Sequence, residues 1–259
     1  MSTFPSSLHT ALEEFSSAPR ILVALDFDGT LAPLVARPQD ARPLPAAVQA
    51  IDALQRQERV HVALVSGRNL ASLHEVYPQG IPELLAGGHG AERQAPRSLS
   101  AAVHNKELNE AQKQLLRQIT GQLEELSARF PGTTLEYKPA ATVLHVRQAS
   151  RPDAAAALEA AQEQFQGIAG IKLLPGKEVL DVSVQPGSKG EALQWLKRLV
   201  QADAMLFAGD DVTDEEGFSV LGPKDLGIKV GEGKTLAKFR VEDPEELSGL
   251  LNILNSMRD

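Results

Sequence analysis

Asp26-Phe27-Asp28-Gly29-Thr30-Leu31 follows directly after the apolar run Ile21-Leu22-Val23-Ala24-Leu25. A short, uninterrupted apolar run of this kind is typical of a strand buried on both faces of a parallel sheet. Asp26 and Asp28 then stand at the carboxyl end of that strand, which is where open α/β sheets bind ligands. Gly29 allows a tight turn that presents bare backbone N–H groups there. The stretch therefore predicts an α/β fold with a phosphate-handling site at one edge of the sheet.

Two further segments repeat this design of an apolar run followed at once by polar residues. Residues 60–65 lead into Ser66-Gly67-Arg68, and residues 204–208 lead into Gly209-Asp210-Asp211-Val212-Thr213-Asp214-Glu215. Between these segments, Lys189 precedes a helical pattern with an apolar leucine face. We therefore expect four polar clusters at one edge of one sheet.

The order of the elements predicts two domains. Residues 1–99 and 186–259 alternate strand and helix signals, which indicates a doubly wound, Rossmann-like parallel sheet built from both ends of the chain. Residues 100–185 follow the order αββαββ, ending in a hairpin that we expect to turn at Pro175-Gly176. Neighbouring strands without a helix between them indicate an antiparallel sheet, so this segment is expected to be an inserted α+β domain.

The composition excludes several classes of protein. The chain has 259 residues, of which 42% are hydrophobic and 23% charged, as in an ordinary globular protein. Its net charge is −8, without a long Lys/Arg run, which argues against nucleic acid as a partner. It has no cysteine for a disulfide or a thiolate metal site, and no apolar run of transmembrane length. A cytoplasmic protein without membrane partners is the default expectation, and a monomer is the default oligomeric state.

The four polar clusters, in their order along the chain, resemble the haloacid-dehalogenase superfamily of aspartate-nucleophile phosphatases. The resemblance implies that Asp26 attacks phosphorus and that Asp28 protonates the leaving oxygen and later activates water. It implies that Ser66, Gly67, Arg68 and Lys189 bind the phosphate group, and that Lys189 also serves the catalytic Asp26. Residues 100–185 resemble the larger type of cap found in this superfamily.

The acidic residues predict a divalent cation. Two unit charges 4 Å apart repel by about 4 kcal/mol at an effective dielectric constant of 20, so several carboxylates around a phosphate dianion require a counter-charge. Oxygen ligands favour Mg²⁺. The resemblance implies that the ion is bound by side chains of Asp26 and Asp210 and by the main-chain carbonyl of Asp28. Asp214 or Asp211 is expected to provide the supporting ligand.

A closer resemblance to the trehalose-6-phosphate phosphatases extends from about residue 20 to residue 255. It rests on residues 25–33, on Gly-His-Gly-Ala-Glu at 88–92, on residues 209–215, and on Glu-Tyr-Lys and His-Val-Arg segments in the insertion. The resemblance implies a sugar-phosphate substrate whose distal glucose is held by polar residues of the cap. The expected cap residues are Glu136, Lys138, Arg147, Lys177 and Asp181. Val146 stands where we expect an aromatic residue, and Asp181 where we expect a glutamate.

Other readings remain open from the sequence. A capped phosphatase acting on sucrose 6-phosphate, a mannosyl phosphoglycerate or a hexose phosphate would carry the same core motifs. A receiver-like signalling module also places aspartates, a Ser/Thr and a Lys on a parallel sheet, although receivers are short and uncapped. A helix N-cap is the alternative role for Ser66. His89 fits a packed side chain in a glycine-rich turn as well as it fits a substrate contact.

Overall fold

The computed structural model describes residues 4–99, 108–184 and 187–258. The chain divides into two compact units. We call Met1–His104 with Ser188–Asp259 the core unit, and Asn105–Gly187 the inserted unit. The predicted limits of the insertion, residues 100 and 185, both lie outside the described residues.

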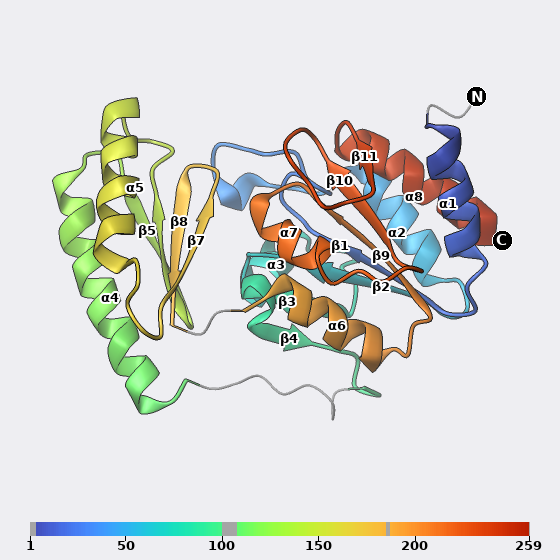
Figure 1. Cartoon of the computed structure of the whole chain (residues 1–259), viewed down its shortest axis with the longest axis horizontal. Helices are drawn as coiled ribbons and strands as arrows, with labels where there is room; N and C mark the ends of the chain where they lie inside the picture. Colours follow the sequence, from blue (N-terminus) through green and yellow to red (C-terminus); the bar gives the residue numbers. More distant parts are fainter. Residues whose placement is uncertain (1–3, 100–107, 185–186, 259) are drawn as a thin grey trace. The chain divides into compact units, whose positions relative to one another are not determined.

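The core unit contains a seven-stranded sheet in the order β11-β10-β9-β1-β2-β3-β4 (Figure 1). Its strands are β1 (Ile21–Leu25), β2 (Val60–Val65), β3 (Leu84–Gly87), β4 (Glu92–Gln94), β9 (Ala204–Gly209), β10 (Leu226–Val230) and β11 (Phe239–Val241). All neighbouring pairs are parallel except β3 with β4, which adds an antiparallel edge strand that the sequence analysis did not predict. The predicted parallel α/β sheet is confirmed.

Helices cover both faces of this sheet. They are α1 (Ser6–Ser16), α2 (Pro45–Gln55), α3 (Leu70–Val76), α6 (Lys189–Leu199), α7 (Glu215–Phe218) and α8 (Pro244–Arg258). Apolar residues of α1, α2, α3 and α8 form one buried cluster, and those of α6 and α7 form the other. Strand β1 contributes Ile21, Val23 and Leu25 to the first cluster and its two remaining residues to the second. Its side chains are therefore buried on both faces, which explains the uninterrupted apolar run.

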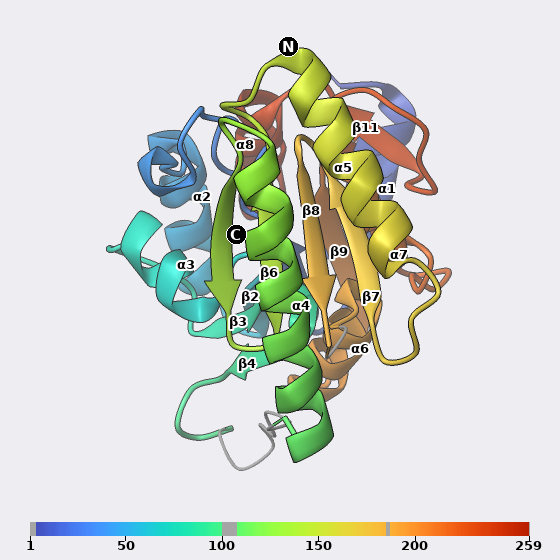
Figure 2. The same ribbon diagram turned by 90° about the vertical axis from the view of Figure 1, so that its left-hand side faces the viewer.

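The inserted unit is a four-stranded antiparallel sheet in the order β5-β6-β8-β7. Its elements are α4 (Glu110–Arg129), β5 (Thr134–Lys138), β6 (Ala141–His145), α5 (Arg151–Phe165), β7 (Lys172–Gly176) and β8 (Val179–Ser183). Apolar side chains of α4 and α5 pack on one face of the sheet, and Figure 2 shows both helices on the same side of it. The observed order αββαββ is the predicted one.

The final hairpin of this unit turns later than the sequence analysis expected. Pro175 pairs with Leu180, and Gly176 pairs with Val179, so both residues belong to β7 and not to the turn. The turn is made by Lys177 and Glu178, of which Glu178 has a φ of 61°. Pro175 is tolerated because β7 is an edge strand, where a missing N–H donor need not interrupt the sheet.

Asp225 ties α6 to the start of β9 and β10. Its Oδ1 accepts hydrogen bonds from Lys197 Nζ at 2.6 Å and from the backbone N–H of Met205 at 2.8 Å. Its Oδ2 accepts from Lys197 Nζ and from the N–H of Gly222, both at 2.9 Å. We expect Asp225→Ala to lower the free energy of unfolding by about 2–3 kcal/mol, because the buried N–H of Met205 and the Lys197 ammonium group lose a charged acceptor. Urea denaturation checks this, and Asp225→Asn, which keeps one acceptor, should cost less.

Within the described residues, no helix combines the length and the apolarity needed to cross a membrane.

Candidate active site

The carboxyl ends of three adjacent strands bring the first polar residues together. Leu25 of β1 lies in register with Leu64 of β2 and Ala208 of β9. Asp26 therefore follows β1 directly, and Ser66 and Asp210 follow one position further along β2 and β9, at the same edge of the sheet. This is the edge that the sequence analysis predicted.

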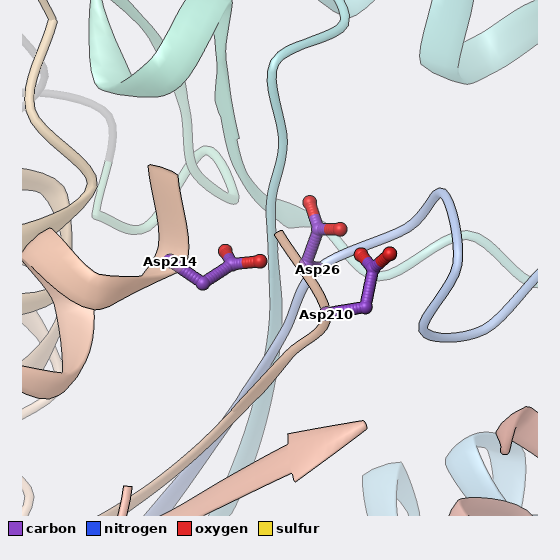
Figure 3. A group of neighbouring side chains, drawn as sticks. All are labelled: Asp26, Asp210 and Asp214. Atoms are coloured by element: carbon purple, nitrogen blue, oxygen red, sulfur yellow. The ribbon is translucent and has the colours of Figure 1, made fainter. Parts of the chain in front are cut away.

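Three carboxylates converge at this edge. Asp26, Asp210 and Asp214 each have an oxygen within 4.8 Å of the others. Figure 3 shows the Asp214 side chain directed toward Asp26, and the Asp26 and Asp210 carboxylates pointing the same way. Asp214 ends a short helical turn, Val212–Asp214, and is fully buried. The side chain of Asp211, also predicted as a supporting ligand, is not a member of this group of described residues. The predicted ligand from Asp28 is its main-chain carbonyl, which a group of side-chain oxygens does not test. Asp211 instead caps the turn that carries Asp214.

Lys189 joins two of these carboxylates. Its Nζ donates hydrogen bonds to Asp26 Oδ1 at 2.9 Å and to Asp214 Oδ1 at 2.6 Å. Lys189 is the first residue of α6 and its side chain is buried. The second oxygen of Asp214 accepts from the N–H of Asp211 at 2.8 Å. Asp214 is therefore held from both sides, and it fixes Lys189 against Asp26.

Burial and neighbouring charges shift the pKa values of the groups at this site. Burial, together with the charges of Asp214 and Asp210, raises the pKa of Asp26 against the opposing effect of Lys189. Burial and the neighbouring Asp214 raise the pKa of Asp210 to about 7. Burial opposes the charged form of Lys189, but Asp214 and Asp26 outweigh it and raise its pKa. One buried ammonium group does not neutralise three converging carboxylates.

The donor set fits Mg²⁺. It consists of carboxylate oxygens, which hard divalent cations prefer, and it contains no sulfur or imidazole ligand. Gly29, with a φ of 77°, leaves room for Asp210, because a Cβ at that position would overlap the Asp210 carboxylate. Both oxygens of Asp214 accept short hydrogen bonds, at 2.6 and 2.8 Å, whereas the contacts of Thr30 with Asp26 Oδ2 and with Asp210 are longer, at 3.5 and 3.4 Å. Asp26 and Asp210 are therefore better placed than Asp214 to bind the ion.

Arg68 lies against Asp28. Its Nε and Nη2 donate to the two oxygens of Asp28, both at 2.6 Å. Its Nη1 donates to Ser72 Oγ at 3.1 Å, and Nη2 also donates to the carbonyl of Pro38 at 2.7 Å. Four of the five N–H donors of the guanidinium are used in this way. Arg68 was predicted to bind phosphate, but here it positions the carboxylate of Asp28.

Ser66 and Gly67 form the short loop between β2 and Arg68. Ser66 is buried, and its Oγ accepts from the N–H of Arg68 at 3.2 Å. It is not an N-cap, because Asn69 caps α3 through a hydrogen bond from the N–H of Ser72 at 2.7 Å. The alternative role of Ser66 as a helix N-cap is therefore wrong. Its predicted contact with phosphate stays a prediction.

Two residues of the site were missed by the sequence analysis. Thr30 Oγ1 lies 3.5 Å from Asp26 Oδ2 and 3.4 Å from Asp210 Oδ1, and its side chain is buried between them. Lys229, buried in β10, donates to the backbone carbonyl of Asp210. The sequence signal for Lys229 was a lysine within an otherwise apolar strand. The sequence signal for Thr30 was a hydroxyl side chain two residues after Asp28.

The inserted unit presents a polar sheet face opposite its helices. Cross-strand pairing of Glu136 with Val143 and of Val143 with Asp181 places these residues on one face, which also carries Lys138 and His145. Lys138 Nζ donates to Asp181 Oδ2 at 2.9 Å, and His145 Nε2 lies 2.9 Å from Glu136 Oε2. Arg147 pairs with Glu178 at 3.1 Å, beside Lys177 in the final turn. The structure thus groups the predicted residues on one face and at its hairpin end.

Comparison with known proteins assigns the family. Residues 24–245 match the family model described as trehalose-phosphatase. The chain belongs to the trehalose-phosphatase family. The trehalose-phosphate phosphatase of Mycobacterium marinum is 32% identical over 264 residues, which cover 96% of this chain. The chain spans 65% of the length of that relative.

Solved structures show the same fold. The C-terminal domain of the C. albicans trehalose-6-phosphate phosphatase superposes with a TM-score of 0.80 at 22% identity, covering 96% of each chain. A trehalose-6-phosphate phosphatase related protein superposes with a TM-score of 0.67 at 25% identity, covering 91% of this chain and 97% of that one. Both likenesses extend over the core unit and the inserted unit.

One departure from the expected family pattern is explained by the fold. Val146 packs with Leu144 and Phe165 in the apolar cluster beneath α4 and α5. An aromatic ring at this position would enter the core of the unit and would not join the polar face that carries Asp181. Valine in place of an aromatic residue therefore affects the packing of the apolar cluster in the inserted unit. On the polar face, the difference from the expected pattern is Asp181, which is shorter than the expected glutamate.

Proposed function

We propose that this chain hydrolyses trehalose 6-phosphate to trehalose and inorganic phosphate with the aid of Mg²⁺. The observation that carries the proposal is the fixed Asp26, bound by Lys189 within a group of three carboxylates, in a chain of the trehalose-phosphatase family. When bound by Asp26 and Asp210, Mg²⁺ would neutralise negative charge on the carboxylates and on the phosphate oxygens.

The chemistry proceeds in two displacements. A carboxylate oxygen of Asp26 attacks phosphorus, the bond from phosphorus to the sugar oxygen breaks, and an aspartyl phosphate forms. Asp28 gives its proton to the departing sugar oxygen. Asp28 then takes a proton from water, the water oxygen attacks phosphorus, and the acyl–phosphate bond breaks to release phosphate and restore Asp26.

Asp28 must present a carboxyl oxygen to the departing sugar oxygen, and in this structure Arg68 donates to both of its oxygens. Substrate phosphate competes for the same guanidinium. We therefore expect part of the Arg68 pairing to pass from Asp28 to a phosphate oxygen when substrate binds. The predicted role of Arg68 in phosphate binding and its observed place against Asp28 are then two states of one side chain.

The proposed substrate contacts in the inserted unit are Glu136, Lys138, Arg147, Lys177 and Asp181. Their arrangement on one face and at its hairpin end supports the binding of a molecule with many hydroxyl groups. Asp181 Oδ1 is buried and has no hydrogen-bond partner among the described residues. A sugar hydroxyl would satisfy this acceptor.

The decisive experiment compares phosphate release from trehalose 6-phosphate, sucrose 6-phosphate and glucose 6-phosphate, with Mg²⁺ and with EDTA. We expect the trehalose ester to have the highest kcat/KM and EDTA to abolish turnover. Mg²⁺ should also raise Tm, because it relieves repulsion between buried carboxylates. A higher kcat/KM for another ester would reject the substrate, and full activity in EDTA would reject the metal.

Asp181→Asn tests the substrate face. We expect kcat/KM for trehalose 6-phosphate to fall by about 10- to 100-fold, as for the loss of a hydrogen bond to a charged group. Turnover of p-nitrophenyl phosphate, which lacks the sugar, should change little. Glu163→Gln, on the exposed surface of α5 in the same unit, is the matched control. Equal losses on both substrates would show that Asp181 acts on the fold and not on the sugar.

A further inference from the structure

The turn that joins β3 to β4, residues 87–92, contacts two elements that carry site residues. We call it the β3–β4 turn. On one side it lies against the loop of residues 66–70, which contains Ser66 and Arg68. On the other side it lies against the first turn of α6, which begins with Lys189. The proposed reaction gives no chemical step to the β3–β4 turn.

Hydrogen bonds attach the β3–β4 turn to the 66–70 loop. The N–H of His89 donates to the carbonyl of Ser66 at 2.8 Å, and the N–H of Gly88 donates to the carbonyl of Arg68 at 2.7 Å. The side chain of Glu92 accepts from the N–H of Leu70 at 3.0 Å. Both backbone neighbours of Gly67 are therefore held by the turn.

The His89 side chain lies against Gly67. A Cβ on Gly67 would stand 2.7 Å from His89 Cε1 and 2.8 Å from His89 Nε2, closer than real Cβ contacts. His89 itself has a φ of 56°, in the left-handed region that non-glycine residues rarely adopt. Such a conformation costs on the order of 1–3 kcal/mol and persists only where the surroundings enforce it.

The opposite side of the turn meets α6. A Cβ on Gly90 would stand 2.8 Å from both the Ala192 Cβ and the carbonyl oxygen of Ser188. Just beyond the turn, the Arg93 guanidinium lies over the Trp195 ring of α6, 4.9 Å from its centroid. The start of α6, and with it Lys189, is thus packed directly against the turn.

We propose that the β3–β4 turn is a positioning element that sets the Ser66–Arg68 loop against Lys189, and that His89 is its positioning residue. The imidazole ring of His89 fills the space next to Gly67 and sets the distance between the 66–70 loop and the β3–β4 turn. Arg68 follows Gly67 and donates hydrogen bonds to Asp28. The position of His89 therefore also affects the position of Asp28, the proposed acid/base group. This inference rests on the proposed function, because it assigns the turn to that same site.

A double-mutant cycle tests the contact. Gly67→Ala should displace the loop and lower kcat/KM by about 10²-fold, as for a misplacement of about 1 Å. His89→Asn removes the ring, keeps a residue that tolerates a positive φ, and should cost less. In the double variant the alanine has room, so kcat/KM should recover by at least about 10-fold over Gly67→Ala alone. Additive losses would overturn the proposal.

Two controls separate positioning from general stability. Gly249→Ala adds the same methyl group in α8, where nothing lies within 4 Å, and should leave kcat/KM unchanged. All kinetics are run well below the lowest Tm, where a purely structural effect would lower Tm and leave kcat/KM intact. That result would also overturn the proposal.

A further arm does not depend on turnover. Inorganic phosphate should raise the Tm of the wild type and of the double variant, and should raise that of Gly67→Ala much less. If the wild type hydrolyses no sugar phosphate, the proposed function is rejected. The phosphate-induced shifts in Tm still test whether the β3–β4 turn positions the 66–70 loop. Equal phosphate-induced shifts in Tm in all variants would show that the contact between His89 and Gly67 does not position the 66–70 loop for phosphate binding.

Discussion

Asp26→Asn is expected to lower turnover of trehalose 6-phosphate by about 10⁴- to 10⁶-fold, the range seen when a catalytic group of a covalent mechanism is removed. The amide has the shape of the carboxylate but cannot attack phosphorus. The loss should not arise from unfolding, since the change removes one of three repelling carboxylates and leaves Lys189 bonded to Asp214. We therefore expect a Tm at least as high as that of the wild type in EDTA.

The intermediate provides a second measurement on the same variant. After rapid acid quench, intact-mass spectra of the wild type with substrate should show a phosphorylated fraction, and those of Asp26→Asn should show none. Asp203→Asn is the matched control, because Asp203 lies at the amino end of β9, opposite the site. Substantial turnover by Asp26→Asn would mean that water attacks phosphorus directly and would reject the covalent route.

The parallel sheet and its polar edge could be predicted because both follow from local patterns. An apolar run such as Ile21–Leu25 is required by burial on two faces, and the residues after it must lie at the strand end. Parallel pairing of β1 with β2 and β9 then brings Asp26, Ser66 and Asp210 to one edge of the sheet, within one residue of the same level.

The partners of individual side chains could not be predicted in the same way. Arg68 reaches Asp28, which lies 40 positions earlier, and this depends on side-chain rotamers and on where the intervening loop runs. The choice between Asp211 and Asp214 depends on a single helical turn that buries one and makes the other its cap. The hairpin turn was misplaced because Pro-Gly is a strong local turn signal, while cross-strand pairing kept both residues in β7.

Lys189→Met is expected to impair stability and catalysis together. Lys189 is buried and bonded to two carboxylates, so its removal leaves Asp26 and Asp214 without this cation. Breaking a buried charge pair by deleting one partner costs about 3–5 kcal/mol. Since Lys189 lowers the pKa of Asp26, its loss also favours the protonated, non-nucleophilic form. We expect kcat to fall by about 10²- to 10³-fold, as for loss of an electrostatic contact to the reacting groups.

A second variant separates the two effects. Lys189→Met combined with Asp214→Asn removes one uncompensated charge, so its free energy of unfolding in EDTA should recover toward that of the wild type. Its kcat should stay low, because nothing then orients Asp26 Oδ1 or balances its charge. Urea denaturation in EDTA and phosphate release with Mg²⁺ measure the two quantities. If kcat recovered along with stability, Lys189 would be a structural residue, and the negative charge of Asp26 would need no ammonium group for attack.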